Sequence, residues 1–394
     1  MVLQPRPASN GMYKISETFW AYRNKITNKL FGIVHMPASG KKKGDVLISY
    51  ITEPFTFAPW EGFPNYHTMY WECFEIAKLF SDKGYAVDIV NVKNEKFIPK
   101  KPYLACIDAE NGLERLYRYL PKECRKVFHI LISYWKDYNE AEEKRIKNIE
   151  KRRGVKLLPR RKMKPSKNAE FADYLEGFGN KTIFKTFEQF KKPIFFIPIS
   201  SVIEFNFPGN KNFDSARKHF LWMGGGGLAL KGLDLVLEAF SKMPDLNLHI
   251  CGPIHGEEDF VEEYKKELYG TPNIKVYGRL DIGGKEFREV INKCGAVIYP
   301  SGGEGSSGAI VQAMHAGLIP IITHETGIQE DSGYIPLINP TPESITKTSR
   351  VFSEMPEESV REFSKKIWEY ARSHYTRKTF SQAYKRFIEE ILKL

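Results

Sequence analysis

Four consecutive glycines followed closely by a lysine are the first residues that could do chemistry. Gly224 to Gly227 follow an apolar run and precede Lys231-Gly232 and a helical pattern. A backbone without Cβ atoms can approach a ligand closely, and a lysine beside a helix N-terminus can neutralise a phosphate. The alternative is a structural tight turn. The residues predicted to contact phosphate are Gly225, Gly226, Gly227 and Lys231.

A second loop, Ser301 to Ser307, is almost entirely Gly and Ser and carries one acid, Glu304. It lies between an apolar run ending at Pro300 and a helical pattern over 309–316, and another apolar run covers 318–323. This order predicts a βαβ unit, in which a ligand binds at the carboxyl ends of the strands and an anion at the helix N-terminus. A carboxylate would repel that anion. We therefore expect Glu304 to accept hydrogen bonds from hydroxyls of the attached group, such as a sugar.

Strands and helices alternate on both sides of a segment rich in Pro, Gly and Asn. Because β, α, β patterns of this length predict parallel strands, we expect two α/β domains with a cleft between the facing carboxyl ends of their strands. The predicted organisation is a first domain over residues 1–200, a linker over 201–218, a second domain over 219–340, and helices over 341–394 that pack back on the first domain.

Some segments carry weaker signals. The apolar residues of the first 44 positions, Phe19, Trp20, Tyr22, Leu30, Phe31 and Ile33, are predicted to pack as an extension of the first domain. A short strand is predicted over 155–158. The aromatic loop over 55–66 could line an acceptor site or could serve packing.

Length and composition limit the classes of protein to which the chain can belong. The chain has 394 residues, of which 42% are hydrophobic and 27% charged, so two domains of ordinary size are expected. Its five cysteines are scattered without a metal-ligand spacing, which predicts a reduced, cytoplasmic protein and no metal site. No apolar run is long enough to span a bilayer, so an integral membrane protein is excluded.

The net charge of +11 is concentrated in one segment, Lys144 to Lys167, which contains 12 Lys or Arg and one acid, Glu150. Such a run either attracts an anionic surface or is a solvated helix end and loop. We predict peripheral contact with an anionic membrane, at its inner face. Nucleic acid is an unlikely partner, because aromatic residues are not interleaved with the charges.

One resemblance covers Phe220 to Leu337, about 120 residues. The ordered segments are the glycine loop, Lys-Gly, DLVLEAF, LHICGP, VYGRL and YPSGGEGSSGAIVQAMHAGLIPIITHETG. This part resembles the C-terminal domain of retaining glycosyltransferases of group 1, which carry a Glu-x7-Glu motif and use nucleotide sugars. The resemblance implies the GT-B fold: two Rossmann-like α/β domains facing a central cleft, with a helical C-terminus.

The resemblance also implies roles for single residues. Glu304 occupies the first motif position, which binds hydroxyls of the donor sugar, and Lys231 occupies the basic position that contacts the donor diphosphate. The backbone that faces the phosphates corresponds to Gly305, Ser306, Ser307 and Gly308. The family often has a histidine near the cleft in the first domain, which points to His129 or His67. For His129, within a predicted strand, a buried core histidine is the alternative.

Two positions depart from the family pattern. The second motif glutamate, which holds the nucleotide ribose, is Gln312, and the arginine five residues before the lysine is Gly226. A neutral amide can still accept from a ribose hydroxyl, with a weaker bond. The missing arginine must be compensated by backbone N–H groups or by another cation. Arg279 is a candidate; the alternative is a surface arginine.

The sequence therefore predicts a glycosyltransferase that moves a sugar from a nucleoside diphosphate sugar to an acceptor hydroxyl of a glycan, a lipid-linked group or a small molecule. The donor is a substrate, and no cofactor is expected. Retention is implied by the resemblance, and polysaccharide biosynthesis is a suitable process. The alternative is a non-catalytic binding or scaffold subunit of the same fold, which Gln312 and Gly226 would suit.

Overall fold

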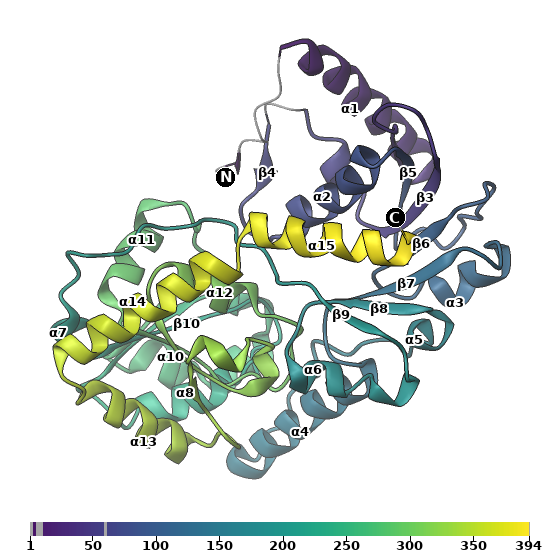
Figure 1. Ribbon diagram of the computed structural model, residues 1–394. Coiled ribbons are helices and arrows are strands. Elements are labelled where there is room, and N and C mark those ends of the chain that lie inside the picture. The colour runs from purple at the N-terminus through teal and green to yellow at the C-terminus, as the bar shows by residue number, and fades with distance from the viewer. Residues whose placement is uncertain (1–2, 5–10, 59–60, 394) are drawn as a thin grey trace.

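The computed structural model describes residues 3–4, 11–58 and 61–393. They form two α/β domains, each built on a mostly parallel sheet, with helices at the C-terminal end of the chain (Figure 1). The predicted class, two Rossmann-like α/β domains with a helical C-terminus, is confirmed. No described helix is both long and apolar enough to cross a membrane.

The first sheet has the strand order β2-β5-β3-β6-β7-β8-β9, in which only β2 is antiparallel to its neighbour. Its strands are β2 (Ile33–Met36), β3 (Gly44–Tyr50), β5 (Tyr85–Asn91), β6 (Ala105–Asp108), β7 (Arg125–Ile130), β8 (Tyr174–Gly177) and β9 (Ile194–Phe196). A separate pair joins β1 (Leu3–Gln4) to β4 (Phe63–Pro64). The helices are α1 (Gly11–Phe31), α2 (Met69–Asp82), α3 (Leu113–Leu116), α4 (Trp135–Arg153), α5 (Asn168–Phe171) and α6 (Lys181–Lys185), with 3-10 turns η1 (Glu53–Phe55), η2 (Tyr117–Tyr119) and η3 (Glu188–Phe190).

The second sheet has the order β12-β11-β10-β13-β14-β15 and is parallel throughout. Its strands are β10 (His219–Met223), β11 (Asn247–Cys251), β12 (Ile274–Gly278), β13 (Ala296–Tyr299), β14 (Ile319–Ile322) and β15 (Ile335–Pro336). The helices are α7 (Phe213–Ala216), α8 (Leu233–Phe240), α9 (Glu258–Glu263), α10 (Lys265–Gly270), α11 (Lys285–Lys293) and α12 (Gly308–His315), with turns η4 (Ile254–Gly256), η5 (His324–Thr326) and η6 (Glu330–Ser332). All four residues of β13 and of β14 are buried, as expected for parallel strands covered on both faces.

The strand order of the second sheet indicates the edge at which a ligand would bind. From β10 the chain moves outward through β11 and β12, and then returns to place β13 on the other side of β10. Neighbouring strands whose connections run in opposite directions leave a crevice between the loops that follow them, and ligands bind there. The loops after β10 and β13 are the glycine loop and the acid loop.

The C-terminal helices divide between the domains. α13 (Pro342–Ser353) packs on α8, and α14 (Glu357–His374) packs on α12, where Ser364 donates a 2.6 Å hydrogen bond to Gly317 O. Only α15 (Arg377–Leu392) crosses to the first domain and lies along α2 (Figure 1). There the Phe380 ring meets the Trp71 ring edge to face at 5.5 Å. The chain end therefore joins both domains.

The N-terminal region differs from its prediction. It forms the long helix α1 and the edge strand β2, and only part of its apolar set is buried: Trp20 packs against Phe55. The exposed members are Phe19, Tyr22, Leu30 and Phe31. The predicted strand over 155–158 is also wrong, because that segment is irregular and Leu158 N donates to Asp259 of the second domain.

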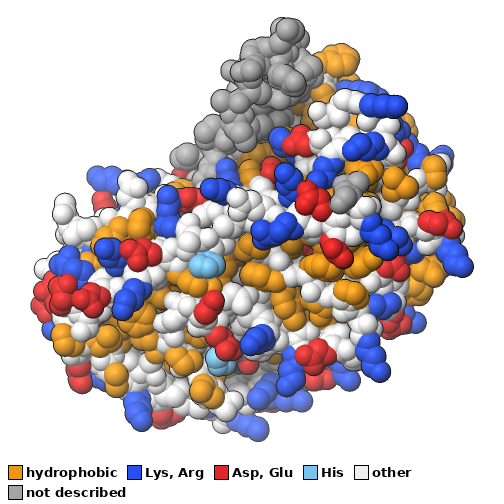
Figure 2. Space-filling view, viewed as in Figure 1, with side chains coloured by type: hydrophobic (Ala, Val, Ile, Leu, Met, Phe, Trp, Pro, Cys, Tyr) orange, Lys and Arg blue, Asp and Glu red, His pale blue; other side chains and the backbone are white. Residues whose placement is uncertain are grey.

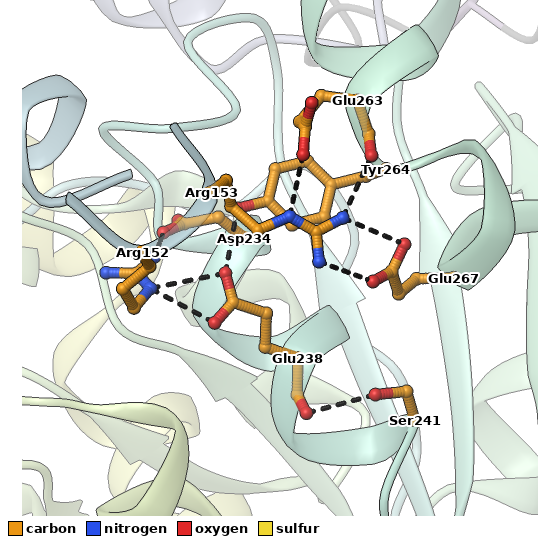
Figure 3. A network of polar contacts seen from close by, with 8 residues as sticks. All are labelled: Arg152, Arg153, Asp234, Glu238, Ser241, Glu263, Tyr264 and Glu267. Carbon is orange, nitrogen blue, oxygen red and sulfur yellow. Dashed lines mark hydrogen bonds and ion pairs between the residues drawn. The ribbon is translucent and has the colours of Figure 1, made fainter. Parts of the chain in front are cut away.

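Part of the basic run pairs with acidic side chains of the second domain, while other cations of the run, such as Lys147 and Lys151, are exposed. Figure 3 shows Arg152 and Arg153, at the end of α4, among acidic side chains of α8, α9 and α10. Arg152 binds the buried Asp234 at 2.5 Å and Glu238 at 3.0 Å. Arg153 binds Glu263 at 2.7 Å and Glu267 at 2.9 Å, and Arg160 binds Asp259. On the face shown in Figure 2, basic and acidic side chains are interspersed.

We expect Arg153→Ala to weaken the attachment of the two domains. The guanidinium is about three-quarters covered and stacks 4.7 Å above the Tyr264 ring, so truncation leaves two partly buried carboxylates without a partner. The free energy of unfolding should fall by about 1–3 kcal/mol, less than for a fully buried pair because solvent reaches the site. Urea denaturation measures this, with Lys151→Ala as the control; equal midpoints for both variants would contradict the assignment.

Phe380→Ala should be strongly destabilising. The side chain is fully buried between α15 and the first domain, and removing it leaves a cavity that costs about 3–5 kcal/mol. The urea midpoint should drop, whereas that of Gln382→Ala, at an exposed position of the same helix, should stay close to wild type. A small effect of Phe380→Ala would mean that α15 is held mainly by other contacts.

Candidate functional site

The glycine loop leads from β10 into α8 and ends at Lys231-Gly232. Gly232 has φ +69°, and a Cβ there would collide with Pro300, the last residue before the acid loop. A glycine is required because the two loops pack directly on each other. This contact fixes the lysine next to the carboxyl end of β13.

The side chains of the predicted lysine and the predicted acid are in contact. Lys231 Nζ lies 3.4 Å from Glu304 Oε1, and Tyr299 donates a 2.8 Å hydrogen bond to the same oxygen. The two charged side chains are mostly covered, with 11% and 14% exposed. Burial, and then the charge of Glu304, raise the pKa of Tyr299 well above its usual value, so its hydroxyl stays a donor.

The acid loop also contacts the first domain. Ser133 N donates to the backbone oxygen of Glu304 at 3.2 Å, and a Cβ at Gly305 would collide with Leu131 O. Tyr138 of α4 packs against Gly303. These contacts hold the carboxylate at the boundary between the domains.

A cavity of about 870 Å³ lies between the domains at this point. It is large enough for a nucleotide-sized ligand. The predicted residues that line it are Gly225, Gly226, Lys231, Arg279, Glu304, Gly305, Ser306, Ser307 and Gln312. The predicted residues that do not line it are Gly227 and His129.

The N–H group of Gly227 is already hydrogen-bonded within the second domain. This N–H and that of Leu228 both donate to the carboxylate of Glu257. Burial raises the pKa of Glu257, while these two N–H groups act in the opposite direction. The two N–H groups are therefore not available to a phosphate, which corrects the expectation for Gly227.

The structure brings in a cation that the sequence motifs do not reveal. Arg161, on the irregular segment after α4, lines the cavity and lies so close to Gly227 that a Cβ there would collide with its side chain. Its Nε donates to Tyr138 Oη at 3.2 Å, and its backbone N donates to Glu142 at 2.8 Å. Burial would lower the pKa of Arg161, but the hydroxyl of Tyr138 and the charge of Glu304 outweigh it, so the pKa is raised and the cation is retained.

Arg279 also reaches the cavity, from the loop after β12. Its guanidinium lies 4.9 Å from the centre of the Tyr66 ring, and both residues line the cavity. Tyr66 is the end of the aromatic loop over 55–66, in which Phe55 and Phe63 are fully buried and serve packing. Residues 59–60 of that loop lie outside the described residues.

Gln312 lines the cavity, but its amide is already bonded. Its Oε1 accepts from Ile203 N at 3.0 Å, and its Nε2 donates to Ile203 O at 2.7 Å. The side chain is 2% exposed and ties α12 to the segment between the domains. A ribose hydroxyl could bind it only by competing with these two bonds.

His129 is a core residue. It is fully buried on β7, its Nδ1 pairs with Glu176 Oε1 at 2.7 Å, and Tyr384 of α15 donates to the same oxygen. Burial would lower the pKa of His129, but the charge and hydrogen bond of Glu176 outweigh it and raise the pKa. The proposed catalytic role of His129 is not supported by its position.

His67 is the histidine that faces the cavity. Its Nδ1 accepts from Met69 N at 3.1 Å. Desolvation by the surrounding protein atoms, followed by the charge of Lys231, lowers the pKa of His67, although part of its side chain stays open to solvent, so the imidazole is neutral at pH 7. Glu72, whose carboxylate accepts from Ser200 N and Oγ, also lines the cavity.

Sequence motifs located the two loops but not Arg161, which comes from an irregular segment without a local pattern and is brought to the site by the position of the first domain. His67 is expected from the family resemblance, as an alternative to His129. The density of cations over 144–167 was the one signal for Arg161. Among the described residues, no group of three or more His, Cys, Asp or Glu side chains is arranged to hold a metal ion.

Comparison with known proteins agrees with this geometry. The family described as "Glycosyl transferases group 1" matches residues 209–333, which contain both loops. No curated protein is similar in sequence to the chain.

Solved structures resemble the whole chain. Sucrose-phosphate synthase from Thermosynechococcus elongatus has a TM-score of 0.61 and 13% identity, over 89% of this chain and 100% of that one. Anabaena Alr3699/HepE in complex with UDP and glucose has a TM-score of 0.57 and 11% identity, with the same coverage of 89% and 100%.

A third similar structure is S. aureus TarM in complex with UDP, with a TM-score of 0.50, 14% identity and 75% of this chain covered. The chain spans 59% of TarM, and 57% of the pneumococcal O-GlcNAc transferase GtfA. The chain therefore has the GT-B fold, and its second domain is similar to the glycosyl transferases group 1 family.

Proposed function

We propose that this protein is a glycosyltransferase that moves a sugar from a nucleoside diphosphate sugar to an acceptor hydroxyl on a glycan, a lipid-linked group or a small molecule. The observation that carries the proposal is the 3.4 Å approach of Lys231 Nζ to Glu304 Oε1 at the edge of one interdomain cavity. Lys231, a cation that can bind a diphosphate, then lies beside Glu304, which can accept hydrogen bonds from sugar hydroxyls. The UDP and glucose in the Anabaena structure support such a donor.

Each group has a distinct part. Lys231 and the N-terminus of α12 would stabilise the negative charge that develops on the departing diphosphate. Glu304, oriented by Tyr299, would accept hydrogen bonds from the sugar. Turnover depends on this geometry because both side chains are mostly covered by protein, and a charge interaction is stronger there than in solution.

The transfer conserves atoms and charge. The bond between the anomeric carbon and the diphosphate oxygen breaks, and its electron pair leaves with the diphosphate. The acceptor oxygen bonds to the same carbon, and its proton passes to the departing phosphate oxygen. With retention, acceptor and leaving group share one face of the sugar, so this oxygen is the base nearest to the proton.

We further propose that Arg161 takes the place of the family arginine, whose position in this chain is occupied by Gly226. The Gly227 and Leu228 N–H groups are bonded to Glu257, so a cation is needed beside the glycine loop. Arg161 lies against that loop, lines the cavity and is held by Tyr138. The diphosphate would then be bound from both domains.

A second candidate is a nucleotide-binding or scaffold subunit without transferase activity. It is favoured by Gln312, whose amide is bonded to Ile203 instead of standing free for a ribose. Calorimetry with UDP and GDP, together with a screen of nucleotide sugars for release of either diphosphate, separates the two. Release with at least one donor supports the transferase, and binding without release supports the subunit.

We expect Lys231→Ala to lower turnover by about 10²–10³-fold, the typical loss when one group that stabilises a developing charge is removed. The Kd for the free diphosphate should rise as well. Lys285→Ala, at a lysine that is 92% exposed, is the control and should retain activity. Full activity of Lys231→Ala would contradict the role.

Glu304→Gln should show a different pattern. It keeps the shape but loses the charge, so turnover should fall by about 10²-fold while the Kd for the free diphosphate changes little, since the carboxylate faces the sugar. Calorimetry and donor turnover measure the two effects. Glu325→Gln, at the exposed residue of the turn η5, is the matched control. A large rise in the diphosphate Kd for Glu304→Gln would place the acid at the phosphates instead.

Arg161→Gln tests the second cation and offers a rescue. Loss of a charged hydrogen-bond donor should raise the diphosphate Kd by about tenfold or more. At Gly226 a Cβ would meet only Glu257 Oε1, at an ordinary 3.6 Å, so an arginine can be introduced there. Arg161→Gln with Gly226→Arg should recover much of the affinity, whereas Lys156→Gln should have no effect. Unchanged affinity in Arg161→Gln would refute the replacement.

A further inference from the structure

The outward face of α1 is apolar from Phe19 to Leu30. Phe19, Tyr22, Ile26 and Leu30 are spaced by three or four residues and therefore form one stripe along the helix. They are 72%, 66%, 46% and 66% exposed, respectively. An ordinary surface helix has the opposite arrangement, with its apolar stripe turned toward the core. The stripe is thus an exposed apolar patch that needs an explanation.

The inner face of α1 is firmly attached, which fixes the direction of the stripe. Asn24 is fully buried; its Oδ1 accepts from His35 N at 3.0 Å, and its Nδ2 donates to His35 O at 3.1 Å. Ala21 is buried beside it, and Trp20 packs edge to face on Phe55. The helix cannot rotate to bury the stripe without breaking these contacts.

Cations border the stripe on both sides. At 100° per residue, Arg23 lies on one flank, and Lys25 and Lys29 lie on the other, and all three are exposed. The whole helix contains four Lys or Arg and one acid, Glu17. An apolar stripe flanked by basic residues matches the boundary between acyl chains and anionic headgroups.

We propose that α1 docks the protein on an anionic lipid surface. The helix lies in the plane of the interface, with the four apolar side chains in the acyl boundary and Arg23, Lys25 and Lys29 at lipid phosphates. This inference does not depend on the proposed transferase activity. It is also distinct from the basic run over 144–167, of which Arg152, Arg153 and Arg160 pair with the second domain.

The test is co-sedimentation of the full chain with vesicles of phosphatidylglycerol and phosphatidylcholine, compared with phosphatidylcholine alone. The wild type should bind the anionic vesicles only. Phe19→Ser with Ile26→Ser and Leu30→Ser should weaken binding by about tenfold or more, as should Arg23→Ser with Lys25→Ser and Lys29→Ser. Circular dichroism verifies that the variants fold, and Phe19→Asp alone provides a smaller change with the same expected direction.

Two matched controls distinguish this site from general effects. Tyr269→Ser with Ile338→Ser and Val351→Ser removes exposed apolar residues elsewhere, and Lys147→Ser with Lys151→Ser and Lys156→Ser removes exposed cations of the basic run. Both should bind like wild type. The proposal is overturned if the wild type does not bind anionic vesicles or if the α1 variants bind them unchanged. It is also overturned if the triple variant at Lys147, Lys151 and Lys156 no longer binds. A dimer of the wild type that dissociates in the Phe19 variants without lipid would likewise contradict it.

Discussion

The apposition of the two domains depends on charge neutralisation across their boundary. The cations at the end of α4 would be costly to cover alone, and so would the buried Asp234. Together with Arg145, which donates to Pro300 O at the end of β13, they hold the second domain against the first. The groups that reach the site from the first domain need this apposition: Ser133, which donates to the Glu304 backbone, and Arg161, which lies beside the glycine loop.

Much of the architecture could be predicted from local patterns. Buried parallel strands such as β13 and β14 are continuous apolar runs, and the helix expected over 309–316 is found as α12, one residue earlier in the chain. The N-terminal region could not be predicted in this way. Its sequence does not say which face is buried, and the structure buries the face of Ala21 and Asn24, where Asn24 is bonded to His35.

The same distinction applies to the candidate site. Lys231 and Glu304 belong to continuous motifs at the switch point of one sheet, so their neighbourhood could be anticipated. Gln312 looked like a ligand-binding residue, yet its partner is Ile203, which is 109 residues away in the chain. Charge runs are equally ambiguous, because the acids that pair with Arg152 and Arg153 come from a different domain. Long-range packing decides such cases.

The return of α15 to the first domain means that the chain crosses between the domains twice. The two crossings are bonded to each other: Trp368 Nε1 of α14 donates to Phe205 O at 2.9 Å, and Arg372 pairs with Glu204. The two crossings therefore form one double connection, so a change in the angle between the domains would have to bend both of them together. The ion pairs of Arg152 and Arg153 span the same boundary, and salt would weaken them because solvent reaches them.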